Sequence, residues 1–379
     1  MVPFDFQPRT RVIFGQGTLS QLGQLAQDLG FRRTLLVSDR GIVDAGHSAA
    51  ATQILESVGI VVTVFSDFGE NPDSAMVEAG RQFAAPLGID SIVGLGGGSS
   101  LDCAKGINFL LTNGGTMSDF RGYGKATTPL LPMIGVPTTA GTGSEAQSYA
   151  VISDAQTHMK VACGDPSAAV RVAILDPALT ASAPKNVTAL AGIDAITHAV
   201  ETAVTTRRTA LSEMFSHHAW RLLNGAFERA LTRAADDAAR GAMLIGSHLA
   251  GAAIEQSMLG AAHACANPLT ARFNMAHGLA LAILLPHVIR WNAPVARFQY
   301  AAMVGSPRGE SDEDPVAMLA RRIEDLAVFA ELPAKLSDAG VDGAALPELA
   351  DLAAQQWTGT FNPRPFDAAG ALEIYRAAL

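Results

Sequence analysis

The chain has 379 residues, of which 49% are hydrophobic and 17% are charged, and it contains 36 glycines. This length predicts two domains with substantial cores, and the composition is that of a globular protein rather than a disordered one. A formal net charge of -9 argues against a nucleic acid or an anionic membrane as partner, so we expect a small-molecule ligand.

The first residues, MVPFDFQPRT, contain no apolar segment of the signal-peptide type, and no uninterrupted apolar run reaches the ~18 residues of a membrane-spanning helix. The three cysteines are odd in number and scattered, without a C-x-x-C pair. This pattern is typical of reduced thiols rather than of a disulfide framework. We therefore predict a soluble, cytoplasmic protein.

In the first half of the chain, short apolar or β-branched runs alternate with stretches of helical character. The runs occupy residues 34–39, 60–67, 91–96, 131–139 and 171–176. This alternation predicts a parallel sheet between helices. Between the last two runs, the segment VISDAQTHMKVA predicts a hairpin that turns around residues 154–157.

From about residue 181 the pattern changes to long stretches rich in alanine and leucine, with helical periodicity and no convincing strand. The segment TASAPKNVTA is the best candidate for the boundary, with Asn186 or Thr188 as a helix cap. We expect an α/β domain over residues 1–181 and an all-α domain over 182–379. The polar segment GSPRGESDEDP, at 305–315, predicts a loop.

Asp194 and His198 lie four residues apart in GIDAITHAVE, which places both side chains on one face of a predicted helix. His263 and His277 lie beside small and apolar residues, where an imidazole needs a partner for its nitrogens. One carboxylate and three imidazoles suit Zn²⁺ or Fe²⁺ better than Ca²⁺ or Mg²⁺. The alternative is an exposed helix pair and two histidines satisfied within the protein. His217 and His218 are adjacent and therefore point in different directions on a helix. These two and the remaining histidines are interpreted as structural: His47, His158, His248 and His287.

The run SIVGLGGGSSLDCAKGI predicts a strand, a glycine turn and a helix, whose free N–H groups and positive dipole end can bind a phosphate. Ser99 and Ser100 can add hydroxyl donors. The alternative is a tight turn that binds nothing. In the usual dinucleotide fingerprint an acidic residue follows the glycines by about 20 positions, whereas here Asp39 precedes them. The sheet must therefore be connected differently.

A second polar turn, GVPTTAGTGSE at 135–145, follows another predicted strand. Two such turns at strand carboxyl ends would face one crevice. Thr138, Thr139, Thr142 and Ser144 could hydrogen-bond a nucleotide there. The alternative is that these hydroxyls only satisfy the backbone of the turn.

Taken together, five segments resemble the iron-containing alcohol dehydrogenase family, in the family's order and over nearly the whole chain. They are GGGSSLDCAKGI, PTTAGTGSE, GIDAITHAVE, HGLALAILLPHVIRWN and FNPRPFDAAGALEIYRAAL. The resemblance implies an N-terminal dinucleotide-binding α/β domain, a C-terminal helical domain and a metal in the cleft between them. The implied cofactors are NAD and Fe²⁺ or Zn²⁺, and the implied assembly is a homodimer or a higher homo-oligomer.

The same resemblance implies roles for individual residues. The four metal ligands fall on Asp194, His198, His263 and His277. The pyrophosphate region falls on Gly97, Gly98, Ser99 and Asp102, the adenosine and nicotinamide sides on Thr138, Thr139 and Thr142, and the ribose beside the nicotinamide on Lys160. The substrate falls between Tyr149, Ile254, Leu259, Asn267 and Thr358.

Two positions bear on specificity. An acid at a strand end, as at Asp39, can accept hydrogen bonds from the ribose of NAD but repels the 2′-phosphate of NADP, so we predict a preference for NAD. Many family members have a histidine where this chain has Asn267. Because an asparagine cannot titrate near neutral pH, we expect no proton relay through that position.

The mechanism that the resemblance implies is hydride transfer between an alcohol and NAD, with the metal as a Lewis acid. Two further functions compete with this one. A dehydroquinate-synthase-like or hydroxyacid-oxoacid-transhydrogenase-like enzyme would use NAD without net turnover, and the former needs basic residues for a phosphorylated substrate. A non-catalytic helical domain with a structural metal would leave the glycine turn unexplained.

Overall fold

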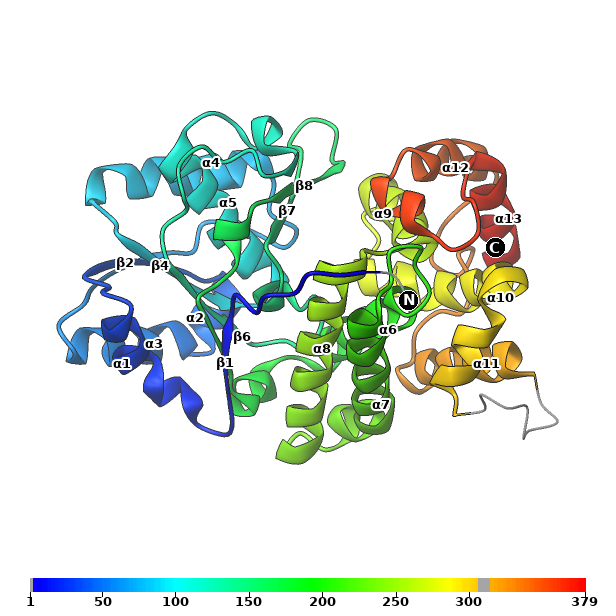
Figure 1. Cartoon of the computed structure of the whole chain (residues 1–379), viewed down its shortest axis with the longest axis horizontal. Helices are drawn as coiled ribbons and strands as arrows, with labels where there is room; N and C mark the ends of the chain where they lie inside the picture. The colour runs from blue at the N-terminus through cyan, green and yellow to red at the C-terminus, as the bar shows by residue number, and fades with distance from the viewer. Residues whose placement is uncertain (1–2, 306–313) are drawn as a thin grey trace. The chain divides into compact units, whose positions relative to one another are not determined.

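The computed structural model describes residues 3–305 and 314–379, and the chain divides into two compact units (Figure 1). The N-terminal unit is Phe6–Ala183. The C-terminal unit is Pro184–Leu379, to which the residues before Phe6 also belong. A loop was predicted at 305–315, and its residues 306–313 lie outside the described residues.

The N-terminal unit contains a six-stranded, all-parallel sheet with the strand order β1-β9-β6-β4-β2-β3. Its strands are β1 (Arg11–Phe14), β2 (Arg33–Val37), β3 (Val61–Phe65), β4 (Ser91–Gly96), β6 (Met133–Pro137) and β9 (Val172–Leu175). The predicted parallel sheet and its five predicted strands are confirmed. Strand β1 was not predicted, because it lies at the sheet edge and three of its four residues are exposed.

Helices cover both faces of this sheet. They are α1 (Leu22–Asp28), α2 (Arg40–Asp44), α3 (His47–Ser57), α4 (Ser74–Ala84) and α5 (Gly98–Asn113). Figure 1 shows α1 and α3 on one face and α4 and α5 on the other. Leu22 and Leu55 pack against Val93 and Ile134 on the first face. Burial on both faces explains why β4, β6 and β9 consist almost entirely of apolar residues.

A second, three-stranded sheet lies in the same unit, in the order β5-β8-β7. Its strands are β5 (Gly122–Tyr123), β7 (Tyr149–Ser153) and β8 (Lys160–Gly164). Strands β7 and β8 are antiparallel and form the predicted hairpin. Asp154 closes the turn by accepting hydrogen bonds from the backbone of Gln156 and Thr157.

The described residues of the C-terminal unit form helices and no strand, as predicted. The α-helices are α6 (Lys185–Thr202), α7 (Ala210–Thr232), α8 (Asp237–Ser257), α9 (Ala261–Phe273), α10 (His277–Met303), α11 (Pro315–Phe329), α12 (Leu346–Ala354) and α13 (Ala368–Ala378). The predicted cap was wrong. Pro184 is the N-cap of α6, its carbonyl accepts from the backbone N–H of Thr188, and Asn186 lies inside the first turn. The restricted φ of proline therefore marks the helix start better than either polar residue.

Helix α10 is, among the described residues, the one helix long and apolar enough to cross a membrane. Two thirds of its most apolar window is nevertheless buried inside the protein. Its apolar side chains thus have partners within the unit, as in the core helix of a globular domain.

A close approach between α10 and α6 places His277 near the other predicted ligands. Gly278 lies directly on α6, and a Cβ at this position would be 2.3 Å from the carbonyl oxygen of Leu190. No larger residue fits without moving one helix away from the other. Glycine here therefore permits the helix packing on which the position of His277 depends.

Candidate metal centre and nucleotide turn

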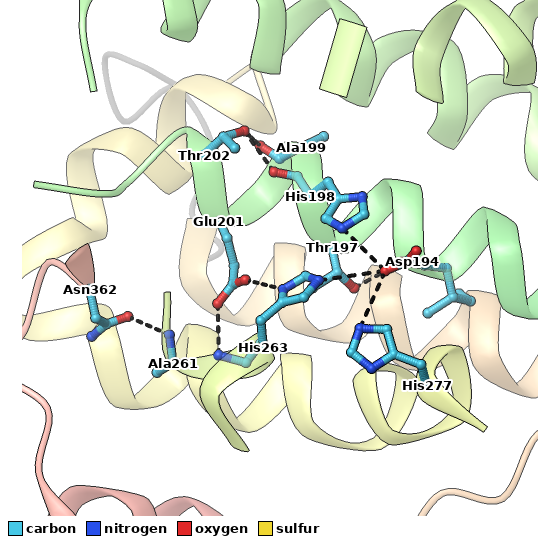
Figure 2. A network of polar contacts seen from close by, with 12 residues as sticks. Asp194, Thr197, His198, Ala199, Glu201, Thr202, Ala261, His263, His277 and Asn362 are labelled. Carbon is cyan, nitrogen blue, oxygen red and sulfur yellow. Dashed lines mark hydrogen bonds and ion pairs between the residues drawn. The ribbon is translucent and has the colours of Figure 1, made fainter. Parts of the chain in front are cut away.

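Three helices of the C-terminal unit bring the four predicted metal ligands together (Figure 2). Asp194 and His198 come from α6, His263 from α9 and His277 from α10. The Oδ1 atom of Asp194 lies 3.3 Å from His198 Nε2, 3.5 Å from His263 Nε2 and 3.9 Å from His277 Nε2. Ligand atoms of Asp194, His263 and His277 all lie within 4.8 Å of one another, as around a single cation.

The donor atoms of this cluster fit a divalent transition metal. Asp194 Oδ1 and His263 Nε2 are buried and have no hydrogen-bond partner, a rare state for buried polar atoms that a cation between them would relieve. One carboxylate and three imidazoles are the donor types that Zn²⁺ and Fe²⁺ accept. The site thus satisfies the chemistry predicted from the residue types.

The cluster also shifts the pKa values of its members. Burial would raise the pKa of Asp194, but the imidazoles around it outweigh that effect and hold the pKa below its ordinary value. Burial would lower the pKa of His263, but Glu201 and Asp194 together raise it to about 9. The carboxylates thus favour positive charge in the cluster, which is what a cation site requires.

Glu201 is a residue of this centre that the sequence analysis missed. Its Oε2 atom lies 2.5 Å from His263 Nδ1, and its Oε1 atom accepts a hydrogen bond from the backbone of Ala262 at 2.7 Å (Figure 2). A signal was present in the sequence, because Asp194, His198 and Glu201 are spaced by four and three residues and share one helix face.

In the N-terminal unit, the glycine turn connects β4 to α5 as predicted. Gly96 has φ of 147°, and a Cβ there would lie 2.3 Å from Ser100 Oγ, so glycine is required. Gly97 is the N-cap of α5 and supplies no side-chain acceptor for the first N–H groups of the helix. These groups remain available to an anion, which fits the predicted binding of a pyrophosphate.

The second polar turn packs against the first, because β6 pairs with β4 in parallel and both strands end at the same edge. The backbone of Thr138 donates to Gly96 O at 2.9 Å, and a Cβ on Gly98 would lie 2.4 Å from a carbon of Thr142. A Cβ on Gly97 would lie 3.3 Å from Thr139 Oγ1. The Thr138 hydroxyl is buried without a hydrogen-bond partner. An unpartnered hydroxyl beside two glycine-rich turns fits a site that a nucleotide completes.

Asp39 lies beside the glycine turn although it precedes it in sequence, because β2 pairs directly with β4. Its Oδ2 atom accepts from Ser100 Oγ at 2.8 Å, and its Oδ1 atom caps α2 through the backbone of Ile42. Ser100 therefore donates to Asp39 rather than adding a donor for a phosphate, as the sequence had suggested. Ser99 Oγ accepts from the backbone of Asn71, a residue that the sequence analysis did not single out.

A buried lysine, also missed in the sequence, holds the second turn in place. Lys105 is fully buried and donates from Nζ to the carbonyl oxygens of Ser144, Gln147 and Tyr149 at 2.6 to 2.9 Å. Asp102 Oδ1 accepts from Ser144 Oγ at 2.6 Å. Burial raises the pKa of Asp102, against the opposing effects of Lys105, Ser144 and Lys160. The structure thus places Asp102 in a network that shapes the turn.

The residues predicted to contact substrate are distributed over both units. Tyr149 begins β7 in the N-terminal unit and packs on Tyr123, with ring centroids 5.5 Å apart. The others belong to the C-terminal unit: Ile254, Leu259, Asn267 and Thr358. Ile254 and Thr358 are buried, and the Thr358 hydroxyl has no hydrogen-bond partner. Asn267 Nδ2 donates to Gln356 Oε1 at 3.1 Å.

Comparison with known proteins decides the family. The model of the iron-containing alcohol dehydrogenases matches residues 8–177, and the model of the family's C-terminal domain matches 188–379. The chain belongs to the iron-containing alcohol dehydrogenase family. It is a metal-dependent enzyme that interconverts alcohols with aldehydes or ketones and uses NAD(H).

Individual relatives agree with this assignment over their full length. The 1,3-propanediol dehydrogenase of Citrobacter freundii is 33% identical, over 99% of this chain and 98% of the relative. The crystal structure of a 1,3-propanediol oxidoreductase superposes with a TM-score of 0.95 at 31% identity and covers 100% of both chains. The sulfoacetaldehyde reductase from Bifidobacterium kashiwanohense, solved with NAD⁺, gives 0.90 at 27% identity over 100% of this chain and 99% of the other.

Removing one imidazole should abolish most of the stabilisation that a metal confers. At a Zn²⁺ concentration of 100 times Kd, the metal adds about 2.7 kcal/mol to the free energy of unfolding. If His277→Ala weakens binding by about 100-fold, the same concentration adds only about 0.4 kcal/mol. Thermal unfolding with and without Zn²⁺ measures this difference. His218→Ala, on the exposed surface of α7, is the control and should keep the wild-type shift. An equal shift in both variants would remove His277 from the ligand set.

Proposed function

We propose that this enzyme acts on short or medium-length uncharged alcohols and their aldehydes, with a metal held by Asp194, His198, His263 and His277. The observation that carries the proposal is the convergence of these four side chains in one cluster, in which Asp194, His198 and His263 are buried and His277 is partly exposed. Relatives that act on 1,3-propanediol support a small alcohol as substrate.

When bound, the metal supplies a Lewis acid that makes an alcohol hydroxyl more acidic, and NAD supplies the hydride acceptor. The chain itself holds the atoms that would bind the metal, and the nucleotide, in fixed positions. Lys105 and Asp102 keep the second turn rigid, while the start of α5 offers N–H groups to the pyrophosphate. We assign the adenosine and nicotinamide sides of NAD to Thr138, Thr139 and Thr142, and the nicotinamide ribose to Lys160.

Asn267 bears on the route by which the proton of the alcohol hydroxyl can leave the site. Asn267 carries no titratable group, and its amide is held by Gln356. We therefore infer that Asn267 relays no proton, and that a bound NAD, through its ribose hydroxyls, and water would supply the route instead. Ile254 and Leu259 contribute apolar surface, and none of the proposed substrate residues is basic. This composition favours an uncharged alcohol over a phosphorylated one.

The direct test is net turnover of the metal-loaded enzyme, followed as absorbance of NADH at 340 nm with a panel of alcohols and aldehydes. We expect steady NADH formation with short primary alcohols and NADH consumption with the matching aldehydes. Metal analysis of the same preparation establishes whether iron or zinc is bound. Tight NAD binding without net turnover would instead favour an enzyme that reoxidises its own NADH within one cycle.

We further propose that Asp39 makes the enzyme prefer NAD over NADP. Its carboxylate is held at the end of β2 by two hydrogen bonds, beside the turn assigned to the pyrophosphate. At ~4 Å and an effective dielectric constant of ~20, repulsion between this charge and a 2′-phosphate is of order 4 kcal/mol, an upper limit in solvent. The carboxylate cannot move away without breaking the cap of α2.

Asp39→Asn should relax this preference, because the amide oxygen can still cap α2, the NH₂ group can donate to the Ser100 hydroxyl, and the charge is removed. We expect the ratio of kcat/KM for NADH to that for NADPH to fall about tenfold to a hundredfold, within the Coulomb limit above. The control is Asp73→Asn, which changes the N-cap aspartate of α4 in the same unit. An unchanged ratio in Asp39→Asn would exclude Asp39 as the determinant of cofactor choice.

We also propose that the enzyme forms a homodimer through the edge of the larger sheet. Strand β1 is an edge strand, and Val12 and Phe14 on it are 42% and 46% exposed. An exposed edge with apolar side chains is a surface that a second copy can cover by a two-fold contact.

Light scattering during size-exclusion chromatography tests the dimer. The wild-type protein should have twice the chain mass of 39.4 kDa, and Val12→Lys should shift it toward the monomer. Val61→Lys is the matched control, because Val61 is 53% exposed on β3, the opposite edge of the same sheet. A dimer that survives Val12→Lys and dissociates with Val61→Lys would place the contact at β3.

We propose a cytoplasmic location. All three cysteines, Cys103, Cys163 and Cys265, are buried free thiols, and burial raises the pKa of each. Unpaired thiols suit a reducing compartment. Cell fractionation checks this, and recovery in a secreted fraction would contradict it.

A further inference from the structure

We propose that Glu201 is the positioning residue of the metal centre. It selects which nitrogen of His263 faces the metal, and it ties that ligand to the first turn of α9. The inference rests on the proposed metal site and adds to it a residue outside the four ligands.

Glu201 has two contacts, one for each carboxylate oxygen (Figure 2). Oε2 lies 2.5 Å from His263 Nδ1, and Oε1 accepts from the backbone N–H of Ala262 at 2.7 Å. The side chain is 3% exposed, so water does not compete for these contacts. Both donors belong to the same turn of α9, and the glutamate comes from α6.

The contact with Nδ1 determines the form of the imidazole. An ionised carboxylate can only accept hydrogen bonds, so Nδ1 must carry the proton. The lone pair of a neutral ring is then on Nε2, the atom that lies 3.5 Å from Asp194 Oδ1. A carboxylate on the far side of a ligating histidine thereby fixes both the tautomer and the ring orientation.

The contact with Ala262 makes the same carboxylate part of the helix cap. Gly260, the N-cap of α9, has no side chain to satisfy the first N–H groups. Asn362 Oδ1 accepts from Ala261 at 3.2 Å, and Glu201 accepts from Ala262. A Cβ on Gly260 would lie 2.9 Å from Asn362 Oδ1 and 3.1 Å from Glu201 Oε1. The start of α9 is therefore built to admit these two acceptors.

Charge balance supports the same role. If Asp194 were the only carboxylate near a divalent cation, one net positive charge would remain among the neutral imidazoles. The carboxylate of Glu201 cancels that charge, because two carboxylates balance one divalent ion. Since an unbalanced buried charge is costly, Glu201 should strengthen binding without touching the metal.

Glu201→Gln tests this role because an amide has one oxygen and one NH₂ group, whereas both wild-type contacts need an acceptor. If its oxygen faces His263, its NH₂ faces the N–H of Ala262 and two donors meet. If its NH₂ faces His263, Nδ1 must accept, and the proton moves to Nε2, where it blocks the metal. Neither orientation reproduces both wild-type contacts.

The test uses Co²⁺ alone, without nucleotide or alcohol, on the full metal-free chain. Competition against a chelator gives the affinity, and the visible absorption of bound Co²⁺ reports the geometry of its ligands. We expect Glu201→Gln to bind Co²⁺ about 10- to 100-fold more weakly and with a changed spectrum. The matched control is Asp367→Asn, a carboxylate-to-amide change at the N-cap of α13, which should keep wild-type affinity and spectrum.

Wild-type affinity and spectrum in Glu201→Gln would overturn the proposal. If this variant does not fold, hydrogen exchange of the wild-type protein decides instead. Co²⁺ should slow exchange at the first turn of α9 more than at the first turn of α8, which Asp236 caps without a metal ligand. Equal slowing of exchange at the two helix starts would overturn the proposed link between the metal centre and the start of α9. Because no turnover is measured, failure of the inference leaves the proposed alcohol chemistry standing, and the reverse also holds.

Discussion

The buried carboxylate of Asp194 imposes the strongest constraint on the C-terminal unit. A charge at 6% exposure is tolerated only among compensating groups, and here the compensation comes from imidazoles on three helices. The helices must therefore approach closely, and Gly278 allows α10 to lie on α6. The packing of the unit and the geometry of its metal centre are consequences of the same requirement.

The N-terminal unit gathers backbone N–H groups and hydroxyls at one edge of its larger sheet, where we propose that the anionic nucleotide binds. Parallel pairing of β4 with both β2 and β6 brings three strand ends to one edge. Asp39, the glycine turn and the second polar turn meet there although they are far apart in sequence. The buried Lys105 holds the second polar turn in place by donating hydrogen bonds to three carbonyl oxygens.

Helical spacing made Asp194 and His198 recognisable in the sequence, and apolar surroundings distinguished His263 and His277 from the other histidines. Glu201 escaped notice because a glutamate on a helix is usually solvated, and only the approach of α9 shows that its oxygens face an imidazole and a helix start. Lys105 escaped for the same reason, since a lysine is rarely fully buried. The cap of α6 was misplaced because polar residues near Pro184 suggested a later start.

Local patterns in the chain were sufficient for the alternation of strands and helices, the two polar turns and the choice of the four residues that we propose as metal ligands. These features depend on periodicity, backbone freedom and side-chain chemistry, which are properties of neighbouring residues. Only the folded chain reveals the strand order and the place of Asp39 beside a turn some 57 residues later. The same is true of the partners of Glu201 and Lys105. Contacts between distant segments depend on which elements pack together, and that choice is made by the whole core rather than by any single stretch.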